Sequence, residues 1–429
     1  MRGQNITLNK ENSMKLKKLF YSFLPGIFLI GYNIGTGSVT SMSKSGANYG
    51  TSLLWTVAIS CLITYYLITH FSRFTLVTGM TVLEAVRKHL HPWLTWFFLG
   101  AISIIIIGAV MGVMGVIADV LEAWSWQVFE TGIPSVIWAI FLSTLILLFF
   151  WTGNTNSVKT MLSYLVILMF FALMANLFFV IPDIKIILQG LIPSIPKDVV
   201  QSDNSALLIM ASMVGTTVSV IVFLIRSILV KESDWTVADI KAQKRDARLS
   251  VIGMFLVSTA IMVSAAATLH ARQLAMNNAS EMIPLLEPLL GTASITVMAF
   301  GILAAGLSSH IPNIMVIPWL LSDIKSEKCN LKTPLNRTII TALTLAGITI
   351  PLFNAKPVFV MLLSQGLLAI LLPAIVGVIF YLTSSGQLMK EHRNKTKDTI
   401  ILAFILLFAL FMGGVGLVGF IKDMLSLIV

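Results

Sequence analysis

Two polar, glycine-bearing stretches interrupt long apolar segments of this sequence, and their side chains are the ones best placed for chemistry. Gly31 to Ser38 places glycines, hydroxyls and an amide in the middle of the apolar segment 20–46. Gly215 to Ser219 places one glycine and three hydroxyls in the middle of segment 206–228. Each glycine costs about 1 kcal/mol relative to alanine in a helix interior, and an opened backbone at membrane depth needs polar partners. Broken helices of this kind are typical of transporters, whose unwound backbone lines a substrate cavity; close helix packing is the alternative.

The two stretches together supply a set of candidate ligands. If the first helix opens at its glycines, free backbone N–H groups point into the cavity at the positive end of a half-helix, which suits an anion or a carboxylate. Hydroxyl groups from the second stretch would complete the site. The residues are Gly35, Thr36, Gly37 and Ser38 from the first stretch and Thr216, Thr217 and Ser219 from the second.

Two ionisable side chains in the apolar segments are candidates for steering or coupling. Lys44 lies six residues beyond Ser38, about 9 Å along a helix. There it would draw anions inward; the alternative is a lysine that snorkels to the outer interface. His310 would carry a coupling proton, because histidine titrates near neutral pH. Its alternative is a hydrogen-bonded structural histidine, or one that faces the inner vestibule. Arg226 is interpreted as a topology anchor or a scaffold ion pair.

The composition places this protein in a membrane. Of its 429 residues, 57% are hydrophobic and 11% are charged, whereas a soluble domain carries about 25% charged residues. No cleavable signal peptide is expected. Apolar runs of about 20 residues predict an all-α integral membrane protein with eleven transmembrane helices. They lie at residues 20–46, 51–71, 95–119, 132–152, 160–181, 206–228, 249–270, 286–306, 338–353, 358–382 and 399–420.

The net charge of +10 follows the membrane topology. If the N-terminus is inside, 23 of the 29 Lys and Arg residues fall on inner segments. This positive-inside pattern predicts the plasma (inner) membrane, a cytoplasmic N-terminus and an outer C-terminus. The expected partners are the lipid bilayer, a small solute or ion, and a coupling proton or ion, whereas nucleic acid is excluded.

Cys61 and Cys329 predict neither a disulfide nor a metal site. No cofactor is expected, and the spans lack the nucleophile, metal cluster or carboxylate pair of an enzyme.

The two breaks lie five helices apart, as in a five-plus-five inverted repeat in which helices one and six are broken. This repeat divides the chain into five parts. They are a cytoplasmic tail (1–18), a first repeat (19–182), an outer loop (183–203), a second repeat (204–383), and an inner loop with one extra C-terminal helix (384–429).

A series of short motifs, taken in order and spacing, resembles the Nramp family of divalent metal transporters. The motifs are Leu76–Gly79, Gly132–Pro134, Lys244–His270, Leu285–Gly291, Leu303–Ser309, Leu363–Gln365, Leu372–Pro373 and Leu382–Ser384. The resemblance covers nearly the whole chain after the N-terminal tail. It implies the LeuT-type fold, with helices three to five and eight to ten as a scaffold.

The resemblance also implies that the ligands of the family are replaced here. Its metal-binding Asp-Pro-Gly-Asn falls on Gly35 to Ser38, and its Met-Pro-His falls on Ser219 to Ile221. A second family histidine falls on Arg226, and the acidic pair of helix three falls on Ile106 and Ala109. No confident metal ligand remains among these positions.

Only the glutamine of helix ten, Gln365, is kept at a position that the family uses near the metal. A divalent cation needs anionic or strongly polar ligands to offset its dehydration. The sequence therefore favours an Nramp-like secondary transporter with a remodelled site, which moves a small anionic or zwitterionic solute by alternating access. The turn at residues 34–37 also resembles that of amino acid–polyamine transporters, which cradle a carboxylate there. The alternatives are transport of Mg²⁺ or Mn²⁺ through a carboxylate-free site, and a non-transporting membrane sensor.

Overall fold

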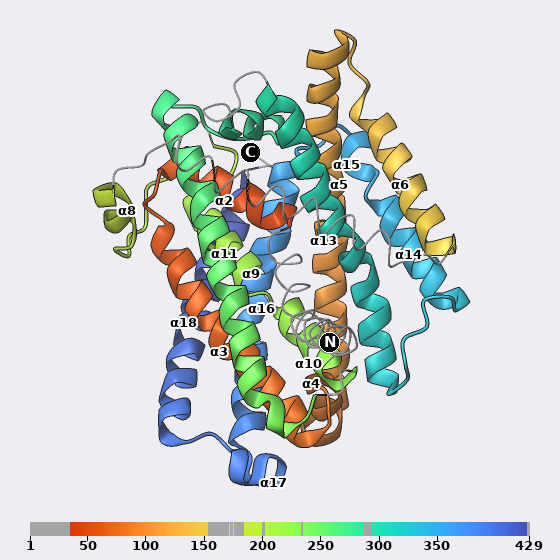
Figure 1. The fold of residues 1–429 in the computed structure, drawn as a ribbon, viewed down its shortest axis with the longest axis vertical. Helices are drawn as coiled ribbons and strands as arrows, with labels where there is room; N and C mark the ends of the chain where they lie inside the picture. Colours follow the sequence, from red (N-terminus) through yellow and green to blue (C-terminus); the bar gives the residue numbers. More distant parts are fainter. Residues whose placement is uncertain are drawn as a thin grey trace, which may run out of the picture.

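The computed structural model describes residues 35–152, 171, 175, 184–199, 202–232, 235–286 and 293–426. Every regular element among these residues is helical, as the apolar segments predict (Figure 1). The elements are α2 (Thr36–Tyr49), α3 (Leu54–Thr78), α4 (Val82–Ala85), η1 (Val86–Leu90), α5 (Pro92–Phe129), α6 (Ser135–Thr152), α8 (Ile184–Gly190), α9 (Ala206–Thr217), α10 (Val220–Glu232), η2 (Val237–Asp239), α11 (Ile240–Thr268), η3 (His270–Arg272), η4 (Ser280–Leu286), α13 (Ser294–Lys325), α14 (Pro334–Ala346), α15 (Thr349–Leu352), α16 (Pro357–Ser384), α17 (Gly386–Met389), η6 (Lys390–His392) and α18 (Thr396–Leu425).

Eight spans in the described part of the chain are long and apolar enough to cross a membrane. α6 adds a shorter apolar helix over Ser135–Trp151. The first predicted segment is described only from Gly35 onward, and the fifth, residues 160–181, lies almost entirely outside the described residues. The total of eleven helices and the inverted repeat therefore remain predictions.

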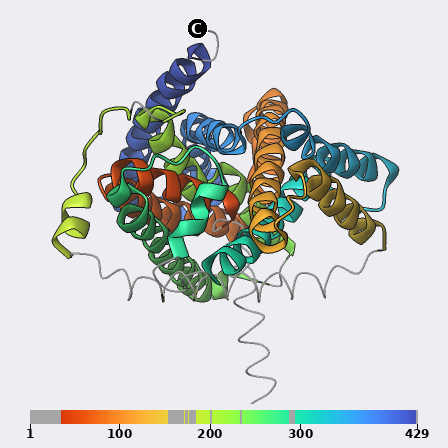
Figure 2. The ribbon, with the colours of Figure 1, turned by 90° about the horizontal axis from the view of Figure 1, so that it is seen from above.

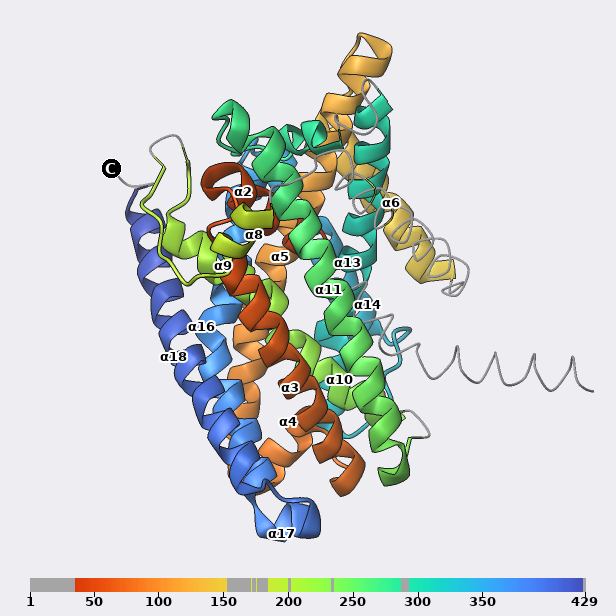
Figure 3. The same cartoon turned by 60° about the vertical axis from the view of Figure 1, so that its left-hand side comes forward.

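The long helices run side by side between two ends of the molecule (Figures 1 and 3). α4 and α17, which belong to segments predicted to be inside, lie at one end. α8 and the C-terminal end of α18, predicted to be outside, lie toward the other. Seen along the long axis, α6 and α14 stand at one flank and α18 and α8 stand at the other (Figure 2). This separation agrees with the alternation that the basic residues predict.

α2, α9 and α10 form the centre of the bundle. Every residue of α2 is buried, although most of them are polar, and the apolar stretch of α9 and α10 is buried throughout. By contrast, only a third of the corresponding stretch of α18 is buried, as suits a helix that faces lipid. A polar helix in the interior reverses the usual amphipathic arrangement. It places the hydroxyl groups of α2 in the centre of the bundle.

The sixth apolar segment is broken, as predicted. α9 ends at Thr217, and α10 begins at Val220 after a residue, Val218, with φ −100° and ψ 58°. The hydroxyl of Thr64 on α3 donates to the carbonyl of Thr217 at 2.8 Å, so a neighbouring helix satisfies a carbonyl at the break. α2 begins directly after Gly35, whose backbone is extended.

A buried ion pair holds the inner half of the broken helix to its neighbours. Arg226 of α10 is fully buried, and its Nη2 lies 3.0 Å from Oδ2 of Asp246 on α11. Its Nε donates to Ser72 of α3 at 3.0 Å, and its guanidinium lies 5.4 Å from the ring centroid of Trp235. Arg226 thus joins α10, α11 and α3, which confirms its interpretation as a scaffold ion pair.

We predict that Arg226→Met alone destabilises the protein by about 3–5 kcal/mol, because it removes the guanidinium that offsets the buried carboxylate of Asp246. The double change Arg226→Met with Asp246→Leu should recover most of that loss. Thermal unfolding of the purified protein in detergent measures both. Equal losses in the single and double variants would contradict this account.

A second polar junction lies at the end of the molecule predicted to be inside. The carboxylate of Glu84 on α4 accepts from Lys231 at 2.6 Å and from Lys88 at 2.7 Å. Thr81 donates to Oδ2 of Asp323 at 2.8 Å, so α4 is tied to both α10 and α13. Burial by itself would raise the pKa of Glu84, but the hydrogen bonds from the two lysines outweigh it and lower that pKa.

A carboxyl group with a lowered pKa stabilises the fold above its ordinary titration range, near pH 4.3, and loses that effect as the pH falls through the folded-state value. We therefore expect Glu84→Gln to lower the thermal midpoint at pH 7. The difference from the wild type should shrink steadily below about pH 4. A difference that stays constant down to acid pH would show that the charge of Glu84 is not what matters.

Candidate functional site

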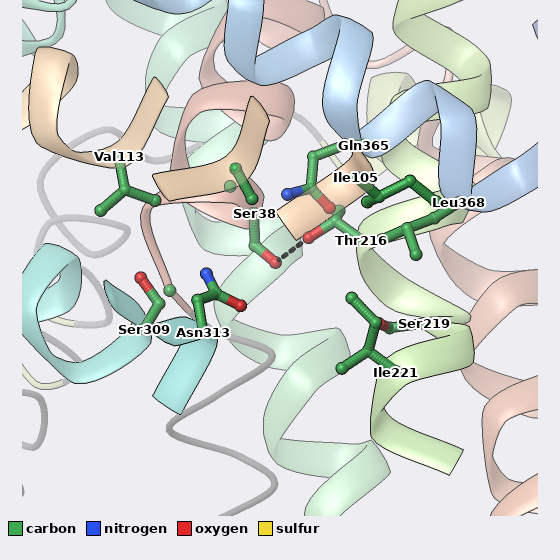
Figure 4. Close-up of a pocket in the computed structure, with 13 residues that line it drawn as sticks. Ser38, Ile105, Val113, Thr216, Ser219, Ile221, Ser309, Asn313, Gln365 and Leu368 are labelled. Atoms are coloured by element: carbon green, nitrogen blue, oxygen red, sulfur yellow. Dashed lines mark hydrogen bonds between the residues drawn. The ribbon is translucent and has the colours of Figure 1, made fainter. Parts of the chain in front are cut away.

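A small cavity lies where α2 begins and where α9 gives way to α10 (Figure 4). Its volume is about 30 Å³. Six elements contribute to it: α2, α5, α9, α10, α13 and α16. The lining residues are Gly35, Gly37, Ser38, Ile105, Ala109, Val113, Thr216, Ser219, Ile221, Ser309, Asn313, Gln365 and Leu368.

Hydroxyl pairs join the two halves of the predicted site. Ser38 of α2 and Thr216 of α9 are hydrogen-bonded at 2.9 Å (Figure 4). One turn further out, Ser41 and Ser212 form a second bond of 2.9 Å. The two polar stretches of the sequence therefore meet, although 178 positions separate Ser38 from Thr216.

Two glycines leave room for Gln365 of α16: its side chain lies against Gly37 of α2, and its backbone lies against Gly215 of α9. A Cβ atom on Gly37 would lie 2.9 Å from Nε2 of Gln365. A Cβ atom on Gly215 would lie 1.9 Å from the backbone carbonyl oxygen of Gln365, so α9 and α16 touch there. Both glycines therefore serve close packing inside helices, and the break in the sixth segment falls at Val218 and Ser219 instead.

Two of the candidate ligands do not line the cavity. Thr36 lies on the side of α2 that faces Gly306 of α13, where a Cβ atom on that glycine would be 3.2 Å from the threonine hydroxyl. Thr217 donates its hydroxyl to the carbonyl of Met213 at 2.8 Å within its own helix. The remaining candidates in the two stretches, and Gln365, do line the cavity.

The sequence analysis did not select Ser309 and Asn313, which also line the cavity. Both are buried, and they project from α13 toward Ser38 (Figure 4). The available signal was their spacing, because polar residues four positions apart lie on the same face of a helix. The packing of α13 beside α2 is needed to show that this face lines the cavity.

The two ionisable candidates lie outside the cavity lining. Lys44 is fully buried and donates to Oδ1 of Asn277 at 3.0 Å, so it does not snorkel to an interface. His310 is also fully buried, and neither of its ring nitrogens has a hydrogen-bond partner within the described residues. It is therefore not held as a hydrogen-bonded structural histidine by that part of the chain.

The chemistry of the cavity is that of neutral oxygen and amide groups. No lining residue is acidic or basic, and no group of three or more His, Cys, Asp or Glu residues in the described part of the chain is arranged to hold a metal. A single water needs about 10–15 Å³ by this measure of volume, so the cavity has room for about two. It suits a small ion with some of its water, and it is too small in this conformation for an amino acid.

A polar cavity at the junction of two buried half-helices, inside a bundle of membrane-length helices, defines a membrane transporter. The family model described as "Natural resistance-associated macrophage protein-like" (Nramp) matches residues 26–419. The chain therefore belongs to the Nramp family, and the resemblance inferred from its motifs is confirmed. The family is one of membrane transporters, so the expectation that the chain is not an enzyme is also confirmed.

Sequence relatives match over nearly their full length. The divalent metal cation transporter MntH of Staphylococcus saprophyticus is 26% identical, with 92% of each chain covered. The divalent metal cation transporter MntH of Caldanaerobacter subterraneus is 23% identical, with 96% of this chain and 95% of that one covered.

Solved structures share the fold. The Eremococcus coleocola manganese transporter in complex with an aromatic bis-isothiourea compound has a TM-score of 0.70 at 16% identity, covering 95% of this chain and 87% of that one. MHP1, a nucleobase-cation-symport-1 family transporter, has a TM-score of 0.50 at 13% identity, covering 94% of this chain and 91% of that one. The fold is thus of the LeuT-like type that these transporters share.

The two close-approach glycines should respond differently to alanine. Gly215→Ala forces a methyl group against a backbone carbonyl, so it should destabilise the fold by about 1–3 kcal/mol or more. Gly37→Ala meets only the end of a flexible side chain, so it should fold but displace Gln365 and weaken substrate binding roughly tenfold. Thermal unfolding and transport assays separate the two effects. Equal losses of stability would contradict the packing described here.

Proposed function

We propose that this chain transports a hard divalent metal cation, Mg²⁺ in particular, which passes through the cavity with part of its hydration shell. The observation that carries the proposal is a cavity of about 30 Å³ whose polar lining consists of neutral oxygen and amide groups. Mg²⁺ prefers oxygen ligands and keeps several of its waters in protein sites. The sequence relatives are likewise named as transporters of divalent metal cations.

The donor set favours Mg²⁺ over Mn²⁺. Mn²⁺ binds more readily than Mg²⁺ to sites that include imidazole or sulfur, and the described residues that line the cavity include no histidine, methionine or cysteine. The hydroxyls of Ser38, Thr216, Ser219 and Ser309 and the side-chain carbonyls of Asn313 and Gln365 are the oxygens that replace part of the hydration shell.

The expectation of an anionic or zwitterionic solute is not supported. It rested on the positive end of α2, but among the residues that the structure describes the lining offers no cationic side chain to hold a carboxylate. The carbonyl end of α9, at Thr217, lies beside the same cavity and has the opposite sign of partial charge. The divalent cation, first held as the alternative, therefore becomes the proposal.

We further propose the membrane arrangement that the charges predict. The chain lies in the plasma membrane with its N-terminus inside and its C-terminus outside, and residues 19–182 and 204–383 form the two inverted repeats. The distribution of basic residues supports the orientation. The break between α9 and α10 supports the repeat.

The test is uptake of Mg²⁺ and of Mn²⁺ into proteoliposomes, with empty vesicles as the blank. We expect saturable Mg²⁺ uptake. Changing Ser38 and Thr216 together to alanine removes two hydroxyls of about 1 kcal/mol each, so the KM for Mg²⁺ should rise about tenfold or more.

Ser41 and Ser212 provide the matched control, because this pair forms the same hydrogen bond one turn away and does not line the cavity. Changing both to alanine should leave the KM close to that of the wild type. Uptake of small anions or amino acids by folded protein that takes up neither metal would overturn the proposal. Folded protein that moves no solute would favour the sensor.

A further inference from the structure

Lys44 is a charged side chain buried in the centre of the transporter. It lies on α2, the helix that begins at the cavity, and its exposed fraction is 0%. Within the described residues its hydrogen-bond partner is the neutral amide oxygen of Asn277, at 3.0 Å. A buried ammonium is costly unless charge and hydrogen bonds compensate it, and ionisable groups at membrane depth are functional by default.

The partner of Lys44 belongs to a set of contacts that closes the outer end of α2. Oδ1 of Asn277 also accepts from the backbone N–H of Asp203 at 3.1 Å. Asn48, one turn beyond Lys44, donates to Ser202 at 2.9 Å and accepts from the backbone of Met276 at 3.3 Å. Two loops far apart in the sequence, before α9 and between η3 and η4, are therefore fastened to α2. We call these contacts the outer closure.

Charges of both signs act on the ammonium of Lys44 from around the outer closure. Asp203, Glu281 and Asp423 act on Lys44 as opposite charges, and Lys356 acts as a like charge. Asp203 is shared, because Lys356 binds its two carboxylate oxygens at 2.8 and 2.9 Å. Glu281 accepts from the backbone of Asn277 at 2.6 Å. The charge balance around Lys44 is therefore sensitive to another cation nearby.

The substrate cavity lies close enough to supply that cation. Lys44 is six residues beyond Ser38 on one helix, a rise of about 9 Å, and helix side chains tilt toward the N-terminal end, which here is the cavity end. A divalent cation in the cavity and the ammonium of Lys44 repel one another at that distance, so the cation binds less tightly. With the dielectric constant of water this repulsion lowers the affinity for the cation about fivefold, and the loss grows as the dielectric constant falls.

We propose that Lys44 couples the outer closure to substrate occupancy: its protonated ammonium stabilises the closure and opposes a divalent cation in the cavity. This inference rests on the proposed function for its substrate. Proton binding at Lys44 and cation binding in the cavity weaken one another, as linkage between two sites requires. The apparent affinity for the cation therefore rises as the pH rises and Lys44 loses its proton.

The experiment measures the initial rate of Mg²⁺ uptake into proteoliposomes from pH 6 to pH 9, with equal pH on both sides. In the wild type the KM should fall as the pH rises. In Lys44→Gln, which keeps a donor for Asn277, the KM should be independent of pH and at least about fivefold lower than that of the wild type at pH 6. Lys44→Arg, which keeps its charge throughout, should retain the high KM at every pH.

Lys422→Gln is the matched control, since Lys422 is an exposed lysine that pairs with Asp198 on the side predicted to be outside and is not among the charges that act on Lys44; it should keep the pH profile of the wild type. A Lys44→Gln variant that retains the wild-type profile, or that takes up Mg²⁺ with a higher KM, would overturn the inference.

A second measurement separates this inference from the proposed function. Ser202→Cys places a thiol in the outer closure, and the native cysteines give a low background because Cys61 is buried and Cys329 lies in a loop predicted to be inside. An impermeant maleimide should label the introduced thiol faster when Lys44 is changed to Gln, and Mg²⁺ should speed labelling when Lys44 is present. If Lys44→Gln speeds labelling but the protein takes up no Mg²⁺, the proposed function is refuted, while the role of Lys44 in stabilising the outer closure is supported. If the protein takes up Mg²⁺ but the labelling rate is the same with and without Lys44→Gln, the inference is refuted.

Discussion

The structure depends on one constraint: an opened helix in a low-dielectric interior must find partners for its backbone. The break between α9 and α10 is tolerated because Thr64 donates to the carbonyl of Thr217. The same region is held together by the bond between Ser38 and Thr216 and by the contact of Gly215 with the backbone of Gln365. Groups that satisfy the break therefore also shape the cavity, and the site and the fold cannot be altered independently.

The two fully buried cations Arg226 and Lys44 differ in how their charge is compensated. Arg226 is paired with Asp246 and bonded to Ser72, an arrangement that fixes three helices in one geometry. Lys44 has a neutral amide as its hydrogen-bond partner and acidic groups at longer range, so its balance is easier to disturb. The described residues that line the cavity carry no charge, so under the proposed function dipoles, hydroxyls and retained water offset the charge of the cation.

Under the proposed function, a lining of neutral polar groups changes the kind of selectivity that the site can exert. Carboxylate, imidazole and thioether groups discriminate among transition metals through bond strength. Hydroxyls and amides discriminate through cavity size and the number of waters that an ion retains. The second mode depends on a cavity of defined volume, and apolar side chains such as Ile105 and Val113 help to shape this one. Selectivity then depends on packing as much as on donors.

The sequence by itself determined the membrane class, the family and the break in the sixth segment. Hydropathy, the order of motifs, and polar residues within an apolar segment can all be read directly from the chain. It also identified Ser38, Thr216, Ser219 and Gln365, which the tertiary structure brings to one cavity. Only the tertiary structure decided that Thr217 turns back to its own helix, and that Ser309 and Asn313 join the site. It likewise decided that Lys44 is buried. The physical reason is that side-chain direction and burial depend on which helix packs against which face, and that pairing is absent from local sequence.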